Sequence, residues 1–289
     1  MVNYAGKRRL GEKPKTGLKN RQRSDEWYER AASKGMVEGE AGNRLIGRVF
    51  DGRAILDYQF ATTDDARTRF PDLWGRLEER LREAGADQHA VFDFEDARNR
   101  RWLEPVFVGQ HFKAERDYVI LERRQTLAED VQPAPRVRPP QPSDLDELFA
   151  VRKEAFPQES SRKGLEEEIA TSPWWGVVEE EGKLAGFAQV GESDGVAWLE
   201  GIAVAPEFQR RGIGDDLLIA ALAWARDNLP GPMRLHTDFW RNEAMGLYKK
   251  HGFSQLLTGV QFKRSLDPEV IAGIIAGRTN VYTRFRGYR

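Results

Sequence analysis

The stretch Gln209-Arg210-Arg211-Gly212-Ile213-Gly214 decides how this sequence is interpreted, because it joins a strand-like run to an amphipathic helix. The run before it, Val196 to Val204, is apolar, and the segment after it carries an apolar stripe at helical spacing. The first N–H groups of a helix have no internal partners, and the helix dipole favours an anion there. Glycines 212 and 214 let the backbone approach such an anion, and Arg210 and Arg211 add positive charge. The pattern predicts a seat for a diphosphate. A purely structural glycine turn is the alternative that these six residues leave open.

Composition excludes several classes of protein. The chain has 289 residues, which suffices for two domains, and 40% of them are apolar, enough for a sizeable core. The net charge of −1 argues against a globally basic nucleic-acid binder. The absence of cysteine excludes disulfides, thiolate catalysis and cysteine-ligated metal. His236 and His251 are each solitary, so we expect no metal. No run reaches the length of a membrane span, and no apolar stretch follows the basic N-terminus. We therefore expect a cytoplasmic protein with no membrane partner.

Charge is concentrated at the N-terminus. Residues 1–24 carry eight lysines and arginines against Glu12 alone, with few large apolar side chains. This composition is typical of a flexible, solvated arm, and a specific nucleic-acid contact is the less favoured alternative.

A proline-rich linker at 131–142 splits the chain and overlaps a first strand near Arg136 to Arg138. Beyond it, Ser143 is the expected N-cap of a helix that stops at Pro157. A second, polar helix is predicted over 162–171. The remaining elements of this half are strands at 174–181, 184–192, 196–205 and 233–238, helices from Ile213 and from Asn242 to His251, and a final strand or strand pair from Phe253 to Arg264.

The first half repeats this pattern in outline. Leu45 to Phe50 and Ala54 to Phe60 are strand-like, and the segment Phe112 to Arg124 resembles Phe253 to Ser265 in place and pattern. An internal duplication is therefore favoured over coincidence. The strand-to-helix link of the first half, residues 62–69, contains no glycine and has adjacent carboxylates that would repel a diphosphate. Its other elements are a helical stripe of Phe70, Leu73, Trp74, Leu77 and Leu81 and a short strand from Ala90 to Phe94.

Residues 136–264 resemble the GCN5-related N-acetyltransferase (GNAT) superfamily. EGIAVAPEFQRRGIG (Glu200 to Gly214) is similar to the family's fourth strand and its Q/R-x-x-G-x-G/A loop, and NEAMGLYKKHGF (Asn242 to Phe253) is similar to a later helix of the family. The resemblance implies an α/β fold (an α+β mixed sheet) built as two tandem GNAT-like domains, each a central mixed sheet flanked by helices. The expected division is a basic flexible arm at 1–24, a degenerate GNAT-like domain at 25–130, the linker, an acetyltransferase domain at 136–264 and a C-terminal tail at 265–289.

The same resemblance implies that acetyl-CoA, or another acyl-CoA, is bound with its diphosphate on the 209–214 loop. The pantetheine would run beside the fourth strand and pair with main-chain groups near Ile202, Ala203 and Val204, where a bulge splays the sheet. Asn242 falls where the family often has an asparagine that touches the cofactor arm. The expected cofactor-binding residues are thus Ile202, Ala203, Val204, Gln209, Arg210, Arg211, Gly212, Ile213, Gly214 and Asn242.

The implied chemistry is direct attack of a neutral amine on the thioester, with a base or water relay that takes the amine proton and an acid that serves the thiolate. Tyr248 is the candidate acid, and helical spacing puts it on one face with Ala244, Leu247 and His251. Glu200 is the candidate base, with an exposed or ion-paired strand carboxylate as the equal alternative. Trp174 and Trp175, after an acidic run at 166–168, fall near the acceptor site, with core packing at least as well supported.

The leading function is an N-acetyltransferase that acts on a small-molecule amine through the second domain. A non-catalytic acyl-CoA-binding or interaction protein is the alternative, and a nucleic-acid-associated protein is the least favoured. The tail from Ser265 leaves open whether it packs on the first domain or is exchanged in a homodimer; a helix is expected at 268–276 and a strand at 280–285.

Overall fold

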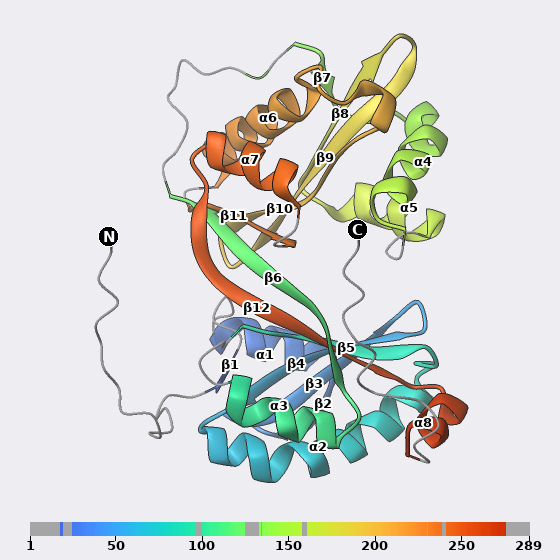
Figure 1. The fold of residues 1–289 in the computed structure, drawn as a ribbon, viewed down its shortest axis with the longest axis vertical. Helices are drawn as coiled ribbons and strands as arrows, with labels where there is room; N and C mark the ends of the chain where they lie inside the picture. The colour runs from blue at the N-terminus through green and yellow to red at the C-terminus, as the bar shows by residue number, and fades with distance from the viewer. Residues whose placement is uncertain are drawn as a thin grey trace. The chain divides into compact units, whose positions relative to one another are not determined.

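The computed structural model describes residues 18–19, 25–95, 100–124, 133, 135–157, 161–229, 231–238 and 241–275. The chain divides into two compact units. Figure 1 shows the ribbon coloured from blue at the N-terminus to red at the C-terminus. Unit 1 comprises Met1–Asp117 with Thr258–Arg289, and unit 2 comprises Tyr118–Leu257. Most of the basic arm, part of the proline-rich linker and the strand expected at 280–285 lie outside the described residues.

The sheet of unit 2 is mixed. Along it, neighbouring strands are antiparallel from β7 to β10, then β10 and β11 are parallel, and the last strand, β6, is antiparallel to β11. The strands in this spatial order are β7 (Val137–Arg138), β8 (Trp174–Glu180), β9 (Lys183–Ser193), β10 (Val196–Val204), β11 (Met233–Asp238) and β6 (Lys113–Arg123).

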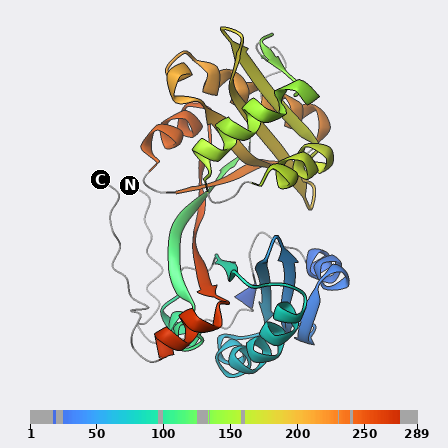
Figure 2. The same ribbon diagram turned by 90° about the vertical axis from the view of Figure 1, so that its right-hand side faces the viewer.

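Helices cover both faces of this sheet. Figures 1 and 2 show α4 (Leu145–Ala155) and α5 (Arg162–Thr171) on one side of the strands and α6 (Ile213–Asn228) on the other. The central strand β9 is accordingly buried on both faces along most of its length. The other helical elements of unit 2 are η1 (Pro142–Asp144), η2 (Pro206–Phe208) and α7 (Asn242–Lys250).

The sheet of unit 1 repeats this pattern. Its strands in spatial order are β2 (Met36–Glu40), β3 (Asn43–Phe50), β4 (Arg53–Phe60), β5 (His89–Phe94) and β12 (Ser254–Ser265), with β1 (Leu18–Lys19) also paired to β4. The first three are antiparallel neighbours, β4 and β5 are parallel, and β12 is antiparallel to β5. The predicted α/β fold with a mixed sheet flanked by helices is therefore confirmed, and the same order of antiparallel and parallel neighbours occurs in both units.

Two cores hold unit 1 together. On β3, Leu45 belongs to the main core and the next residue, Ile46, packs with Tyr28 and Ala31 of α1 (Asp25–Lys34), because successive strand residues face opposite sides. The main core is rich in aromatic rings and includes the predicted stripe of α2 (Thr63–Glu83), all of which is buried. The remaining helices of unit 1 are α3 (Arg100–Gly109) and α8 (Pro268–Ile275).

The two units exchange their last strands. Tyr118 to Arg123 of β6 pair with β11 in unit 2, whereas Val260 to Ser265 of β12 pair with β5 in unit 1. Phe112 nevertheless packs in the core of unit 1, and Phe253 packs in the core of unit 2. The compact units thus differ from the linear halves expected at 25–130 and 136–264, because each sheet is completed by a strand from the other repeat.

Most locally determined elements lie where the sequence predicts them. Helix α5 and strand β11 have the predicted bounds, and β12 is one strand rather than a pair. Ser143 is not the N-cap expected for the helix that follows it: it lies inside η1, and Asp144 stands at the N-cap of α4. The Asp144 carboxylate is held there by Arg138, at 2.6 and 3.0 Å, and by the Gln141 N–H.

Candidate functional site

The carboxyl half of β10 separates from β11. The two strands pair from Ala197 to Leu199, and among the described residues no strand pairs with that edge of β10 from Glu200 onward. On its other edge β10 stays paired with β9 as far as Val204, with a register shift between Leu199 and Gly201 that makes Glu200 a bulge. A bulge adds one residue to a strand and bends it. The bulge expected near Ile202 to Val204 is instead at Glu200, because Gly201 to Val204 pair regularly with β9. The main chain of Ile202–Val204 has an open edge on the side of β11.

The loop after β10 reaches the N-terminus of α6 through two residues in the left-handed region. Arg210 has φ of 64° and Gly212 has φ of 80°. Gly212 is the N-cap of α6, and no side chain caps the helix there. Left-handed backbone is strained for a residue with a Cβ, and such strain is concentrated at ligand-binding sites. The unfilled N-terminus of α6 has the geometry of an anion seat.

The first turn of α6 carries two carboxylates, and both are held by cations. Asp215 lies 2.6 Å from the Lys250 ammonium and 2.7 Å from Nε2 of His251. Burial alone would raise the pKa of Asp215, but the hydrogen bonds from Lys250 and His251 outweigh burial and lower the pKa below its usual value. Asp216 is held by Arg136, which also donates to the Arg211 carbonyl at 3.3 Å. The charge that would repel a diphosphate is thus neutralised locally.

The three polar side chains of the loop have different surroundings. Gln209 donates from Nε2 to the Val204 carbonyl at 3.1 Å, so it ties the loop to the end of β10. Arg211 pairs with Glu181 at 2.6 Å and lies over the Phe208 ring. Arg210 remains 85% exposed and lies 3.6 Å from Glu243. Of these residues, Arg210 has the side chain most available to an anionic ligand, because its ion pair is long and solvated.

Helix α7 packs beside this loop. A Cβ built on Gly214 would lie 3.5 Å from Leu247 and 3.8 Å from Val204, so the start of α6, the end of β10 and α7 meet there. Tyr248 is buried on the inner face of α7, as predicted, with its ring 5.9 Å from that of Phe253. Burial raises the pKa of Tyr248 to about 12, against an opposing effect of Arg241. The phenol therefore stays protonated at neutral pH. Asn242 is the exposed first residue of the same helix.

Glu200 is joined to a buried polar network. Its Oε2 accepts a hydrogen bond from Nε2 of Gln189 at 3.0 Å, and Gln189 also donates to Ser172 at 2.8 Å. Burial raises the pKa of Glu200, the neighbouring Glu168 carboxylate raises it further, and Arg152 lowers it in part. A carboxylate with a raised pKa is a stronger base than an ordinary surface glutamate.

Two further residues fix the place of that carboxylate. Arg152, itself buried, donates to Oε1 of Gln189 at 3.2 Å and pairs with Glu168 at 2.8 Å, so it orients the Gln189 amide. Gly191 leaves room for the carboxylate, because a Cβ there would lie 2.1 Å from Oε1 of Glu200. Glu200 is thus an exposed strand residue, as the alternative expected, but its carboxylate is held in place by the buried Gln189 amide.

Trp174 and Trp175 were expected either near the acceptor site or in the core, and Trp175 lies in the core. Trp175 is buried and packs in the core with its ring 5.6 Å from that of Phe187. Its Nε1 donates to the Glu168 carbonyl at 3.3 Å. Trp174 is half-buried at the edge of the same core. His251 pairs with Asp215 through its ring, while its backbone N–H caps α7.

Unit 1 lacks the corresponding loop. Only Ala61 separates the end of β4 from Thr62, the N-cap of α2, where unit 2 has Ala205 to Arg211. The Thr62 side chain accepts from the Asp65 N–H at 3.0 Å and donates to the Asp65 carboxylate at 2.6 Å. The N-terminus of α2 is thus capped by the chain's own side chain, whereas no side chain caps the N-terminus of α6.

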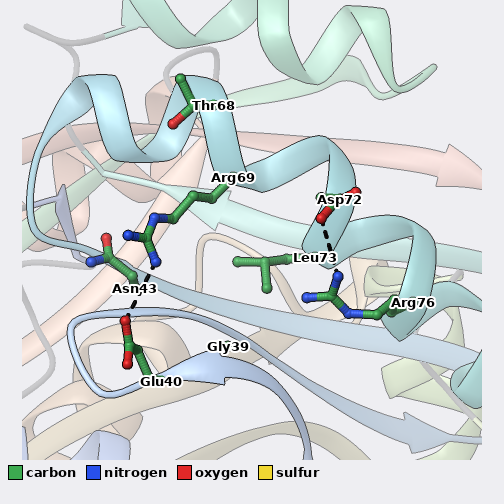
Figure 3. Close-up of a pocket in the computed structure, with 8 residues that line it drawn as sticks. All are labelled: Gly39, Glu40, Asn43, Thr68, Arg69, Asp72, Leu73 and Arg76. Carbon is green, nitrogen blue, oxygen red and sulfur yellow. Dashed lines mark hydrogen bonds and ion pairs between the residues drawn. The ribbon is translucent and has the colours of Figure 1, made fainter.

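A surface hollow in unit 1 lies apart from these groups. Figure 3 shows its lining between the β2–β3 hairpin and α2: Gly39, Glu40, Asn43, Thr68, Arg69, Asp72, Leu73 and Arg76. Its charged side chains are paired, Arg69 with Glu40 at 3.4 Å and Arg76 with Asp72 at 3.1 Å. The hollow is therefore a mixed-charge surface without an unmatched cation or anion in its lining.

Sequence reasoning missed four residues of this site: Arg136, Arg152, Gln189 and Gly191. Their roles depend on the register of β9 against β10 and on contacts between segments far apart in the chain. A motif reveals residues near one another in sequence, and none of these four belongs to the 200–214 segment.

Among the described residues no group of three or more histidine or acidic side chains could hold a metal ion. No helix of the described chain is long and apolar enough to cross a membrane.

Comparison with known proteins matches one segment of the chain to the family that its motifs resemble. Residues 143–253 match the family described as Acetyltransferase (GNAT) family. A Bacillus subtilis (strain 168) relative, named as a candidate ribosomal protein bS18-alanine N-acetyltransferase, is 25% identical over 111 residues, 38% of this chain and 74% of the relative. Streptothricin acetyltransferase A of the same organism is 34% identical over 87 residues, 26% of this chain and half of that protein.

Solved structures extend the likeness of fold across both units. A GCN5-related N-acetyltransferase from Sphaerobacter thermophilus is 17% identical with a TM-score of 0.59, covering 80% of this chain and 78% of its own. A tandem GNAT protein from the clavulanic acid biosynthesis pathway has the same TM-score at 14% identity, covering 80% and 81%. At these identities the structures establish the fold alone. The family match supports an acyl-CoA-dependent acetyltransferase in general.

Proposed function

We propose that unit 2 transfers an acetyl group from acetyl-CoA to the amine of a small molecule, since residues 143–253 match the GNAT acetyltransferase family. One observation carries the proposal: the open edge of β10 at Ile202–Val204 leads directly to the uncapped, glycine-started N-terminus of α6. An extended pantetheine can pair with the first, and a diphosphate can bind the second.

The residues present fit that co-substrate. The left-handed Gly212 offers backbone N–H groups without a Cβ, and Arg210 offers an exposed guanidinium. Asp215 and Asp216 are already paired with Lys250 and Arg136, and His251 forms a further hydrogen bond with Asp215. Ile213 and Gly214 complete the loop, and Asn242 begins the helix beside it.

In the proposed reaction, Glu200 takes the proton of the acceptor ammonium, directly or through water. The neutral nitrogen attacks the thioester carbonyl; the C–N bond forms, the C–S bond breaks, and the nitrogen releases its remaining extra proton to water. Tyr248, which burial keeps protonated at neutral pH, donates its hydroxyl proton to the departing thiolate and is reprotonated from water. The network of Gln189 and Arg152 keeps the Glu200 carboxylate in place.

The acceptor class is proposed as a cationic amine. The bulge of β10 carries Glu200, and Glu168 lies near enough to raise the pKa of that carboxyl. Because Glu168 is paired with Arg152, the Glu200 carboxylate is the one proposed to attract a positively charged acceptor. The relatives' names, a ribosomal protein bS18-alanine N-acetyltransferase and a streptothricin acetyltransferase, specify two different acceptors, so neither is assigned to this chain.

The test is release of free thiol from acetyl-CoA with a panel of primary amines and the full-length chain. We expect amine-dependent thiol release and a product heavier by one acetyl group. Saturable acetyl-CoA binding without turnover by any amine would instead support the alternative, a non-catalytic acyl-CoA-binding or interaction protein.

Replacing Tyr248 with phenylalanine should lower kcat by about a hundredfold and leave acetyl-CoA affinity nearly unchanged, because the variant loses only a proton donor. The ring of Tyr248 contacts Phe253, and phenylalanine keeps that contact. Tyr58→Phe in the core of unit 1 is the matched control and should keep full turnover. Full activity of Tyr248→Phe would end its assignment as the acid.

Replacing Glu200 with glutamine should lower kcat/KM by about a hundredfold and remove an acidic limb from the pH profile. The base form is the carboxylate, so the wild-type rate falls as pH drops through the pKa of Glu200, which burial has raised. The acceptor's own ionisation is common to both proteins and cancels in the ratio of their rates. Glu192→Gln, in an exposed carboxylate of β9, is the control. A ratio that does not change with pH would show that another group is the base.

A further inference from the structure

In unit 1 the edge of β4 that corresponds to the open edge of β10 is occupied by strand β1. β4 pairs with β3 along its whole length, so one of its two edges is filled. On the other edge it pairs with β5 only from Arg53 to Ile55. β1 pairs antiparallel with the end of β4, Leu18 opposite Phe60 and Lys19 opposite Gln59. Because a strand has two edges, β1 lies in the gap that opens where β4 leaves β5.

This gap corresponds to the open edge of unit 2. In both units the parallel pair comprises three residue pairs, beginning at Arg53 in β4 and at Ala197 in β10. Counted from the buried residues Ala54 and Ala197, with the bulged Glu200 left out of the count, Gln59 and Phe60 correspond to Ala203 and Val204. These are the residues beside which, under the proposed function, pantetheine is bound.

Burial differs at the last of these positions. Phe60 is 2% exposed and packs in the main core of unit 1, whereas its counterpart Val204 is half-buried. Gln59 and its counterpart Ala203 are both half-buried. In unit 1 the place of the open edge is therefore taken by Leu18–Lys19.

We propose that the gap between β4 and β5 is a peptide-binding groove that the chain fills with its own segment at Leu18–Lys19. Main-chain hydrogen bonds add this segment to the sheet by strand addition. Unit 1 thus holds a basic strand where unit 2 is proposed to hold pantetheine. The strand and the capped N-terminus of α2 together exclude acyl-CoA from unit 1. The correspondence with pantetheine rests on the proposed function, but the occupation of the groove does not.

Cysteine cross-linking tests the occupant, because the chain has no native cysteine. In the full-length chain, Lys19→Cys with Gln59→Cys places two thiols on directly paired residues. Paired antiparallel residues have Cα atoms about 4.5–5.5 Å apart, inside the range that a disulfide spans. Lys19→Cys with Ile55→Cys is the control, since Ile55 is an exposed residue on the same face of β4, about 13 Å further along.

Under mild oxidation at low protein concentration, the first pair should form an intramolecular disulfide at least about tenfold faster than the control pair. Equal rates, or a product linked between two chains, would overturn the proposal. Amide exchange supplies a second measurement. The full-length Leu18→Pro/Lys19→Pro variant cannot donate from these residues and should exchange faster at 56–60 but not at 196–204. Unchanged exchange at 56–60 would also overturn it. Neither readout depends on acetyl transfer, so failure of the proposed function would leave both results interpretable.

Discussion

Replacing Gly212 with valine is expected to weaken acetyl-CoA binding by about 10²- to 10⁴-fold. The residue has φ of 80°, and valine avoids that region because of its branched Cβ. The loop must then move, and the N–H groups of the helix start no longer point at the diphosphate. Loss of two charge-assisted hydrogen bonds at about 1.5–3 kcal/mol each gives the stated range.

A second glycine separates this effect from general strain. Gly195, in the β9–β10 turn, has φ of 74° and open space where a Cβ would be placed. Gly195→Val should therefore cost similar stability and leave the dissociation constant unchanged. Isothermal titration of both full-length variants with acetyl-CoA makes the comparison. Equal affinities for the two variants would show that the diphosphate does not bind at Gly212.

Replacing Phe262 with alanine is expected to destabilise unit 1 by about 3–5 kcal/mol, the usual cost of removing a buried phenylalanine. Phe262 is fully buried. Its ring stacks on Phe92 at 5.3 Å and meets Phe107 edge-on at 5.0 Å. Although this residue follows the acetyltransferase segment in sequence, its contacts are in the core of unit 1.

Hydrogen exchange after urea titration locates that loss. Protection of α2 should fall in Phe262→Ala, while protection of α6 should be retained, because α6 packs in the other core. Val270→Ala, at an exposed position of α8, should change stability by less than about 0.5 kcal/mol. Loss of protection in α6 with α2 unchanged would contradict the exchange of last strands.

Locally encoded features were predictable from the sequence. The glycine loop, the start of α6 at Ile213 and the polar helix at 162–171 follow from caps and periodicity within a few residues. Most strands also followed, because alternating and apolar runs mark strands independently of their partners. The inner position of Tyr248 on α7 is another local consequence, set by helical spacing.

Features that depend on strand pairing were not predictable. The sequence shows that β6 and β12 resemble one another, but it carries no local signal that each completes the sheet of the other unit. Residues 1–24 were expected to be a solvated arm, whereas Leu18–Lys19 form a strand on β4. Two residues are too few for a periodic pattern, so composition governed the expectation.

The acidic residues at the start of α2 do not by themselves distinguish the first repeat from the second. Its acidic link was expected to repel a diphosphate, yet α6 begins with two carboxylates as well. The units differ because Asp215 and Asp216 are neutralised by cations, whereas α2 is capped by Thr62 and Asp65. Cap geometry and loop length, rather than formal charge, therefore distinguish the two helix starts.

The central claim is that each chain holds one acyl-CoA, in unit 2. Native mass spectrometry of the full-length protein, titrated with acetyl-CoA, counts the bound molecules directly. We predict saturation at one acetyl-CoA per chain, with that complex absent in Gly212→Val. Two bound molecules per chain, or a single one that survives in Gly212→Val, would contradict the account.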